Sequence, residues 1–112
     1  MGLTYCPRNK SIDAFDVNVC GADILGGIHH ALGLPVYASR FAPPYRAPFS
    51  MKAKEARAAA KLLATKTDDE INAVIKDEHL ESCWGDSLDE FVKWTRSWGN
   101  FLQNCSGYKV PG

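Results

Sequence analysis

The stretch "VNVCGADILGGIHHALGLP", residues 17–35, decides the fold because a strand pattern changes into a helix pattern within it. Residues 14–20, "AFDVNVC", alternate between apolar and polar side chains, which indicates a strand with one buried face. A helix is expected from about Asp23 to Leu32, with the Asp23 carboxylate as its cap and Gly33 as its stop. The sequence therefore predicts a strand that leads through a turn of small residues into a helix.

The middle of this helix carries two glycines and two histidines. Gly26 and Gly27 leave room for the helix to pack closely on a sheet or on another helix. At 100° per residue, His29 lies at the edge of the apolar arc and His30 lies roughly opposite it. A joint metal site is therefore not indicated. His30, on the outer side, is the residue of this stretch best placed to contact a ligand.

Two chemical interpretations of the same stretch are weaker than the structural one. Cys20, near a helix start, has the setting of a nucleophile, but either histidine would lie about 9 Å or more beyond that start, too far to act as its base. A phosphate-binding loop is disfavoured because the glycine spacing fits no phosphate motif and Asp23 would repel an anion. We interpret the stretch as a strand–helix packing unit and keep a Cys- or His-dependent enzyme as the third functional hypothesis.

The whole chain predicts an α+β fold that is mostly helical, in a single compact domain over residues 1–112. A short strand, "LTYC", precedes the stretch, and "YKV" near the C-terminus is expected as an edge strand beside the N-terminal strands. Thr67 with Glu70 and Ser87 with Glu90 have the spacing of capping boxes. Three further helices are expected, over about residues 51–65 with Ser50 as N-cap, 68–80 and 88–104.

The net charge of zero conceals two adjacent blocks of opposite charge. Residues 40–66 carry seven Lys/Arg and one acid, Glu55, whereas residues 67–90 carry nine Asp/Glu and one base, Lys76. Such blocks can pair within the fold or between subunits, or they can face different partners. The acidic block would oppose a DNA backbone, so duplex nucleic acid is disfavoured as a partner.

Residues 37–61 have the composition of a binding segment. Aromatic rings can stack on a planar ligand, while arginine and lysine side chains can hold phosphate or carboxylate groups. The candidate ligand-binding residues, with His30 added from the first helix, are Tyr37, Arg40, Phe41, Tyr45, Arg46, Lys54, Arg57, Lys61 and His30. The leading hypothesis is a small non-enzymatic binding module that captures an anionic partner, either a nucleotide-type small molecule or an acidic protein surface, and thereby sequesters or inhibits it.

The second hypothesis is a protein–protein inhibitor or adaptor that uses the acidic residues 67–90 and the aromatic residues of the last helix. The apolar arc of that helix spans about half its circumference, which indicates a central helix or contact with another chain, and we expect a homo-oligomer. No motif indicates a cofactor or a metal ion, and the four cysteines are expected to be buried thiols. The absence of an apolar leader or a membrane-length segment predicts a cytoplasmic protein without membrane contact.

Overall fold

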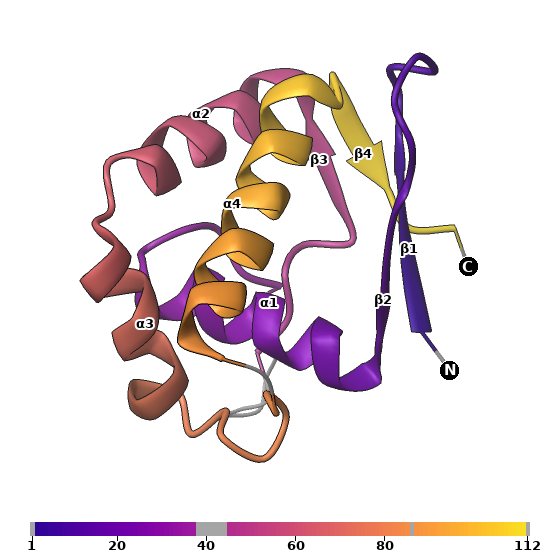
Figure 1. The fold of residues 1–112 in the computed structure, drawn as a ribbon. Helices are drawn as coiled ribbons and strands as arrows, with labels where there is room; N and C mark the ends of the chain where they lie inside the picture. The colour runs from indigo at the N-terminus through magenta and orange to yellow at the C-terminus, as the bar shows by residue number, and fades with distance from the viewer. Residues whose placement is uncertain (1, 38–44, 86, 112) are drawn as a thin grey trace.

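The described residues form four short strands and four helices, and Figure 1 shows their arrangement. The structure is a computed structural model that describes residues 2–37, 45–85 and 87–111. Its elements are β1 (Gly2–Pro7), β2 (Phe15–Asn18), α1 (Val19–Ala31), β3 (Ser50–Lys52), α2 (Ala53–Ala64), α3 (Asp68–Asp77), α4 (Leu88–Asn104) and β4 (Gly107–Lys109). The predicted α+β, mostly helical fold class is confirmed.

The four strands form one antiparallel sheet in the order β2-β1-β4-β3. Leu3 of β1 pairs with Val17 of β2, and Tyr108 of β4 pairs with Met51 of β3. The C-terminal strand therefore lies inside the sheet, so its prediction as an edge strand is wrong. The reason is β3, a strand that the sequence analysis did not find because its three residues precede a run of strong helix formers.

The start of α1 differs from the sequence prediction by four residues. The Asn18 side chain accepts a hydrogen bond from the backbone N–H of Gly21 at 2.7 Å, so the helix begins at Val19 and Asp23 is not its cap. Cys20 consequently lies in the first turn of the helix and not at the end of a strand. The predicted stop is confirmed, because Gly33 follows the helix with a φ of 75°, a value that glycine adopts without strain.

The other helix boundaries follow their caps. In α3, Thr67 and Glu70 exchange side-chain hydrogen bonds with each other's backbone N–H at 2.9 and 3.1 Å, which confirms the predicted capping box. The helix ends at Asp77 and not near residue 80. α4 has the predicted bounds, and Ser87 caps it by accepting the N–H of Glu90 at 3.3 Å. α2 begins at Ala53, so Ser50 is not its N-cap.

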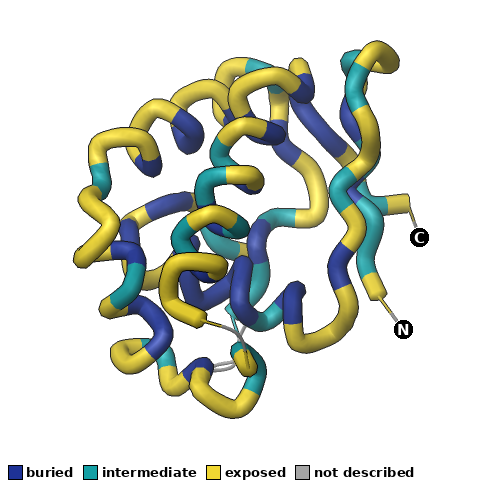
Figure 2. The backbone as a smooth tube through the Cα atoms, in the orientation of Figure 1, coloured by how far each residue is buried: buried dark blue, intermediate teal, exposed yellow. Residues whose placement is uncertain are grey.

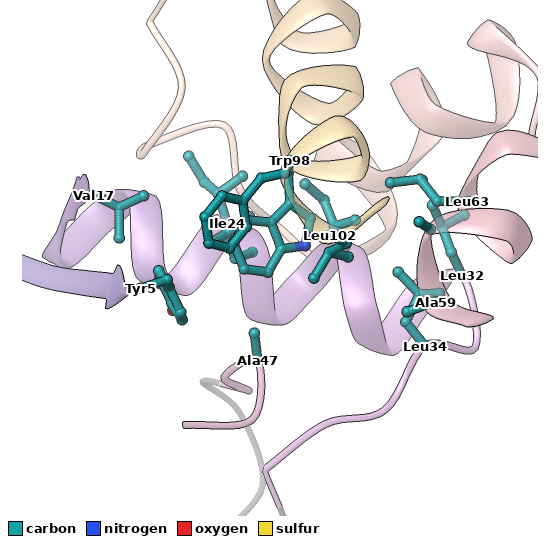
Figure 3. Close-up of a cluster of buried hydrophobic side chains, with 14 of the residues drawn as sticks. Tyr5, Val17, Ile24, Leu32, Leu34, Ala47, Ala59, Leu63, Trp98 and Leu102 are labelled. Atoms are coloured by element: carbon teal, nitrogen blue, oxygen red, sulfur yellow. The ribbon is translucent and has the colours of Figure 1, made fainter. Parts of the chain in front are cut away.

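The core is centred on α4, which crosses the middle of the view in Figure 1. Trp98 is fully buried, and its ring lies 5.0 Å from the ring of Tyr5 in the sheet (Figure 3). It also lies 5.8 Å from the ring of Tyr108, in β4. Figure 2 shows exposed positions along the outer sides of α2 and α3. Most of the wide apolar arc of α4 is therefore covered by the chain itself, while Leu88 at its start remains 53% exposed.

No helix in the described part of the chain combines the length and the apolar character that crossing a membrane requires.

Candidate functional site

The predicted binding segment is divided between two places in the fold. Tyr45 and Arg46 lie against α1, where they meet His30 and Asp23. The lysine and arginine side chains of α2 lie on the outer face of that helix. Two of the candidate residues, Arg40 and Phe41, fall outside the described residues. The structure thus does not bring the remaining candidates into one site.

His30 joins three segments of the chain. Its ring stacks on the ring of Tyr45, with 3.8 Å between centroids and 8° between planes. Its Nδ1 lies 3.1 Å from both carboxylate oxygens of Glu78, which follows α3. The imidazole therefore holds the segment after residue 44 and the end of α3 against α1, and one ring face and Nδ1 are already engaged by the protein's own side chains.

Arg46 is engaged in a similar way. Its Nη2 lies 2.9 Å from Oδ1 of Asp23, and about a quarter of each side chain is exposed. A carboxylate in ionic contact offsets the charge of the guanidinium, so Arg46 has less attraction for an external anion than an unpaired arginine. Asp23, predicted from the sequence as a helix cap, instead fixes the position of Arg46.

The two glycines of α1 make these contacts possible. A Cβ atom on Gly26 would lie 1.7 Å from the backbone oxygen of Tyr45, and one on Gly27 would lie 2.9 Å from Cδ1 of Leu80. The prediction that the glycines permit close approach is confirmed. The partners, however, are the segment that carries Tyr45 and the residues after α3, so α1 is packed between them.

A hollow of about 510 Å³ adjoins the His30–Tyr45 stack. Three carboxylates line it, from Asp23, Asp77 and Glu78, together with the imidazole of His79. An anion entering this hollow would face net negative charge. Within the part of the chain that the structure describes, no three His, Cys, Asp or Glu side chains are grouped so as to hold a metal ion.

The basic side chains of α2 are arranged differently. Lys54, Arg57 and Lys61, which we call the α2 basic face, are all exposed on one side of the helix. The opposite side is apolar and buried, and consists of Ala56, Ala59, Ala60 and Leu63. Among the described residues, none of the three basic side chains forms an ion pair. The α2 basic face is therefore free to meet negative charge from outside.

Tyr37, the first candidate of the segment, packs on Phe49 with 4.9 Å between ring centroids. Its backbone N–H donates to the carbonyl oxygen of Arg46 at 2.8 Å, which holds residues 37 and 46 beside each other. The Tyr37 side chain remains 47% exposed. It is thus partly used as an anchor, and it lies with an aromatic neighbour and not with the α2 basic face.

His29 has a structural role that the sequence did not reveal. Its side chain is fully buried; Nδ1 lies 2.6 Å from the carbonyl oxygen of Pro35, and Nε2 accepts a hydrogen bond from the indole N–H of Trp98 at 2.9 Å. Burial lowers the pKa of His29 to about 4, partly opposed by the hydrogen bond to Pro35. The ring is neutral at pH 7 with both nitrogens engaged, so it is not available as a base for Cys20.

Sequence reasoning also missed a pair of thiols. Cys20 is exposed in the first turn of α1, and Cys83 lies in the connection between α3 and α4 within hydrogen-bonding reach of it. The two residues are 63 positions apart, so no local motif signals their contact. The expectation that all four cysteines are buried is wrong, because burial holds only for Cys105.

Comparisons with models of protein families, with curated proteins and with solved structures give no match.

Proposed function

We propose that this chain is a non-enzymatic binding module whose α2 basic face docks on an anionic partner. The supporting observation is that three cationic side chains are exposed on one side of α2 without ion pairs among the described residues. The buried alanines opposite them hold α2 close to the core, so the helix presents its charges on a fixed backbone. Such a face attracts negative charge and orients it.

The partner that fits this face best is the acidic surface of another protein. The three cations stand on the convex outside of a helix, where they can meet carboxylates spread over a surface. A nucleotide-type ligand would need aromatic rings beside the cations, but Tyr45 is stacked on His30 and Tyr37 packs on Phe49. The hollow next to Tyr45 is lined by carboxylates. These contacts favour the protein partner over the small molecule.

The acidic residues 67–90 have less support as a docking surface, because several already serve the fold. Glu70 caps α3, Glu78 contacts His30, and Asp68 lies 3.0 Å from Nη2 of Arg96. The inhibitor or adaptor hypothesis based on this block therefore stays the second one. A second copy of the chain is the alternative source of acidic surface, and the experiment below separates it from a different protein.

A charge-reversal experiment tests the proposal with a fluorescent polyglutamate peptide as the acidic probe. Replacing all three residues of the α2 basic face by glutamate should weaken binding by at least about tenfold, and added salt should weaken wild-type binding in the same way. The matched control changes the net charge equally at exposed positions elsewhere, with the substitutions Lys10→Glu, Lys76→Glu and Lys109→Glu. This control should retain most of the affinity.

Two results would contradict the proposal. Equal losses in both triple variants would mean that the probe senses only net charge, and equal affinities in all three proteins would mean that α2 takes no part. Light scattering of the protein without the probe tests whether the partner is a second copy of the chain or a different protein. If the chain is an oligomer that the α2 triple variant dissociates while the control does not, the docked acidic surface belongs to another copy of the chain.

A further inference from the structure

The contact between Cys20 and Cys83 is independent of the α2 basic face. The connection between α3 and α4 passes below α1 in Figure 1, whereas α2 lies at the top of the same view. Cys83 lines the hollow beside Asp23 and His30, and it also lines a second hollow of about 310 Å³ next to Asn18, the cap of α1, and Gly21 in its first turn. Cys83 therefore lies across the first turns of α1, where Cys20 is exposed.

Both thiols are positioned by ordered backbone. Cys20 follows the Asn18 cap by two residues, so its place in the first turn is fixed by the start of the helix. On the other side, the backbone N–H of Cys83 donates to the carbonyl oxygen of Leu80 at 2.9 Å. The next residue, Trp84, donates its indole N–H to the carbonyl oxygen of Ser87 at 3.1 Å and packs edge-on against Phe91. The contact between the two thiols is therefore positioned on one side by the start of α1 and on the other by the connection between α3 and α4.

We propose that Cys20 and Cys83 form a reversible dithiol–disulfide pair whose oxidant is a low-molecular-weight disulfide. In the first step the Cys20 thiolate attacks one sulfur of the oxidant, the oxidant's S–S bond breaks, and one thiolate leaves. In the second step the Cys83 sulfur attacks Sγ of Cys20, the mixed disulfide breaks, and a second thiolate leaves. The two cysteine protons pass to the leaving thiolates by way of solvent. The chain is oxidised by two electrons, and the small disulfide is reduced to two thiols.

The two cysteines have different roles in these two reaction steps. Cys20 is exposed and can meet the oxidant, whereas Cys83 is only partly accessible. The hydrogen bond to Cys20, together with burial, raises the pKa of Cys83 and so favours its protonated form. Cys83 then acts as the resolving thiol, because it already lies next to the sulfur that it has to attack.

The remaining cysteines provide matched controls. Cys105 is fully buried and its thiol lies 3.5 Å from the carbonyl oxygen of Leu102, inside the core. Cys6 lies in β1, where it pairs with Lys109 of β4. Neither has a thiol partner among the described residues. A site-specific reaction at Cys20 and Cys83 can therefore be distinguished from general thiol oxidation.

The test treats the reduced full chain with oxidised glutathione, blocks the remaining thiols by alkylation, and follows intact mass and peptide maps. Before alkylation, the oxidised wild-type protein should be two hydrogens lighter than the reduced chain. After alkylation in denaturant, the peptide map should show the Cys20 and Cys83 peptides linked and Cys6 and Cys105 alkylated. In Cys83→Ser, Cys20 should instead accumulate one glutathione, to a level at least about tenfold above the transient adduct of the wild-type protein, because the resolving thiol is absent. Cys6→Ser should behave as the wild type.

Several results would overturn the proposal. They are an unoxidised wild-type chain, a map that links Cys20 to Cys6 or to a second chain, and a Cys83→Ser variant without glutathione on Cys20. Circular dichroism establishes whether each variant is folded. If Cys83→Ser is unfolded, the peptide map of the wild-type protein alone shows whether Cys20 and Cys83 are linked, since that measurement requires no substitution. Restoration of the original mass by dithiothreitol supports reversibility, and its failure contradicts it.

Discussion

The buried histidine makes a prediction about acid stability that can be worked out from the structure. Above pH 6.5 the His29 imidazole is neutral in both the folded and the unfolded chain, so its neutral contacts with Trp98 and Pro35 are fully present. Between pH 6.5 and about 4 the unfolded chain binds a proton that the buried ring does not. The free energy of unfolding therefore falls as the pH falls through this window.

The size of the effect follows from the pKa difference. One pKa unit corresponds to about 1.4 kcal/mol, so lowering the pKa of His29 from 6.5 to about 4 links about 3 kcal/mol to the pH. Between pH 7 and pH 5, where the unfolded chain takes up most of this proton, the free energy of unfolding should decrease by about 2 kcal/mol through His29 alone. Carboxylates add a background that does not depend on this residue.

Urea unfolding of the wild-type protein and of His29→Gln at pH 7 and pH 5 isolates the contribution of His29 to the pH dependence of the free energy of unfolding. Glutamine does not titrate, so the variant should lose about 2 kcal/mol less than the wild type over the same interval, whatever its stability at pH 7. NMR of the folded wild-type protein should show His29 ring signals that do not titrate between pH 7 and pH 5. Equal losses in both proteins, or a ring that titrates near pH 6.5, would refute the assignment of a neutral buried imidazole.

Three other measurements test the packing and the thiol pair. Gly26→Ala should lower the free energy of unfolding by about 3 kcal/mol because its methyl group meets neighbouring backbone, whereas Gly85→Ala, at an open position, should stay within about 0.5 kcal/mol; similar urea curves for the two would contradict this packing. Thr67→Ala should lower the free energy of unfolding by about 1 kcal/mol because α3 loses its cap, and an unchanged thermal midpoint would argue against the cap. The Cys20–Cys83 disulfide should stabilise the chain by up to about 4 kcal/mol in denaturant titrations of oxidised and reduced protein, and a lower stability after oxidation would mean that the native geometry is distorted.

Local signals in the sequence predicted most of the helices. The Thr67–Glu70 box and Gly33 are each decided by a few neighbouring residues, and the structure confirms both. The sequence predicts the start of α1 at Asp23, whereas Asn18, which the alternation pattern assigns to the strand, is the residue that accepts the N–H of the helix. Boundaries that depend on a choice between two such residues need the three-dimensional context of the strand before them.

Contacts between distant segments could not be predicted in the same way. The strand Ser50–Lys52 exists because it pairs with β4, more than fifty residues later, and its own composition favours no strand. The contact of Arg46 with Asp23 and that of Cys20 with Cys83 depend equally on how α1 packs. The sequence indicates that several of these side chains could bind a ligand or react, but it does not show which of them contact one another within the fold.

The aromatic residues of the binding segment illustrate what this difference means for function. In the sequence, Tyr37 and Tyr45 beside arginines favour a ligand that is both stacked and charged. In the fold, Tyr45 stacks on His30 and Tyr37 packs on Phe49, while the cations that form no ion pair among the described residues lie on α2. If the protein binds through the α2 basic face, as proposed, these two rings add no stacking contribution and the interaction of this face rests on charge. Such binding weakens steeply with ionic strength, since surface charges are screened over about 10 Å at 0.1 M salt, whereas stacked binding would persist.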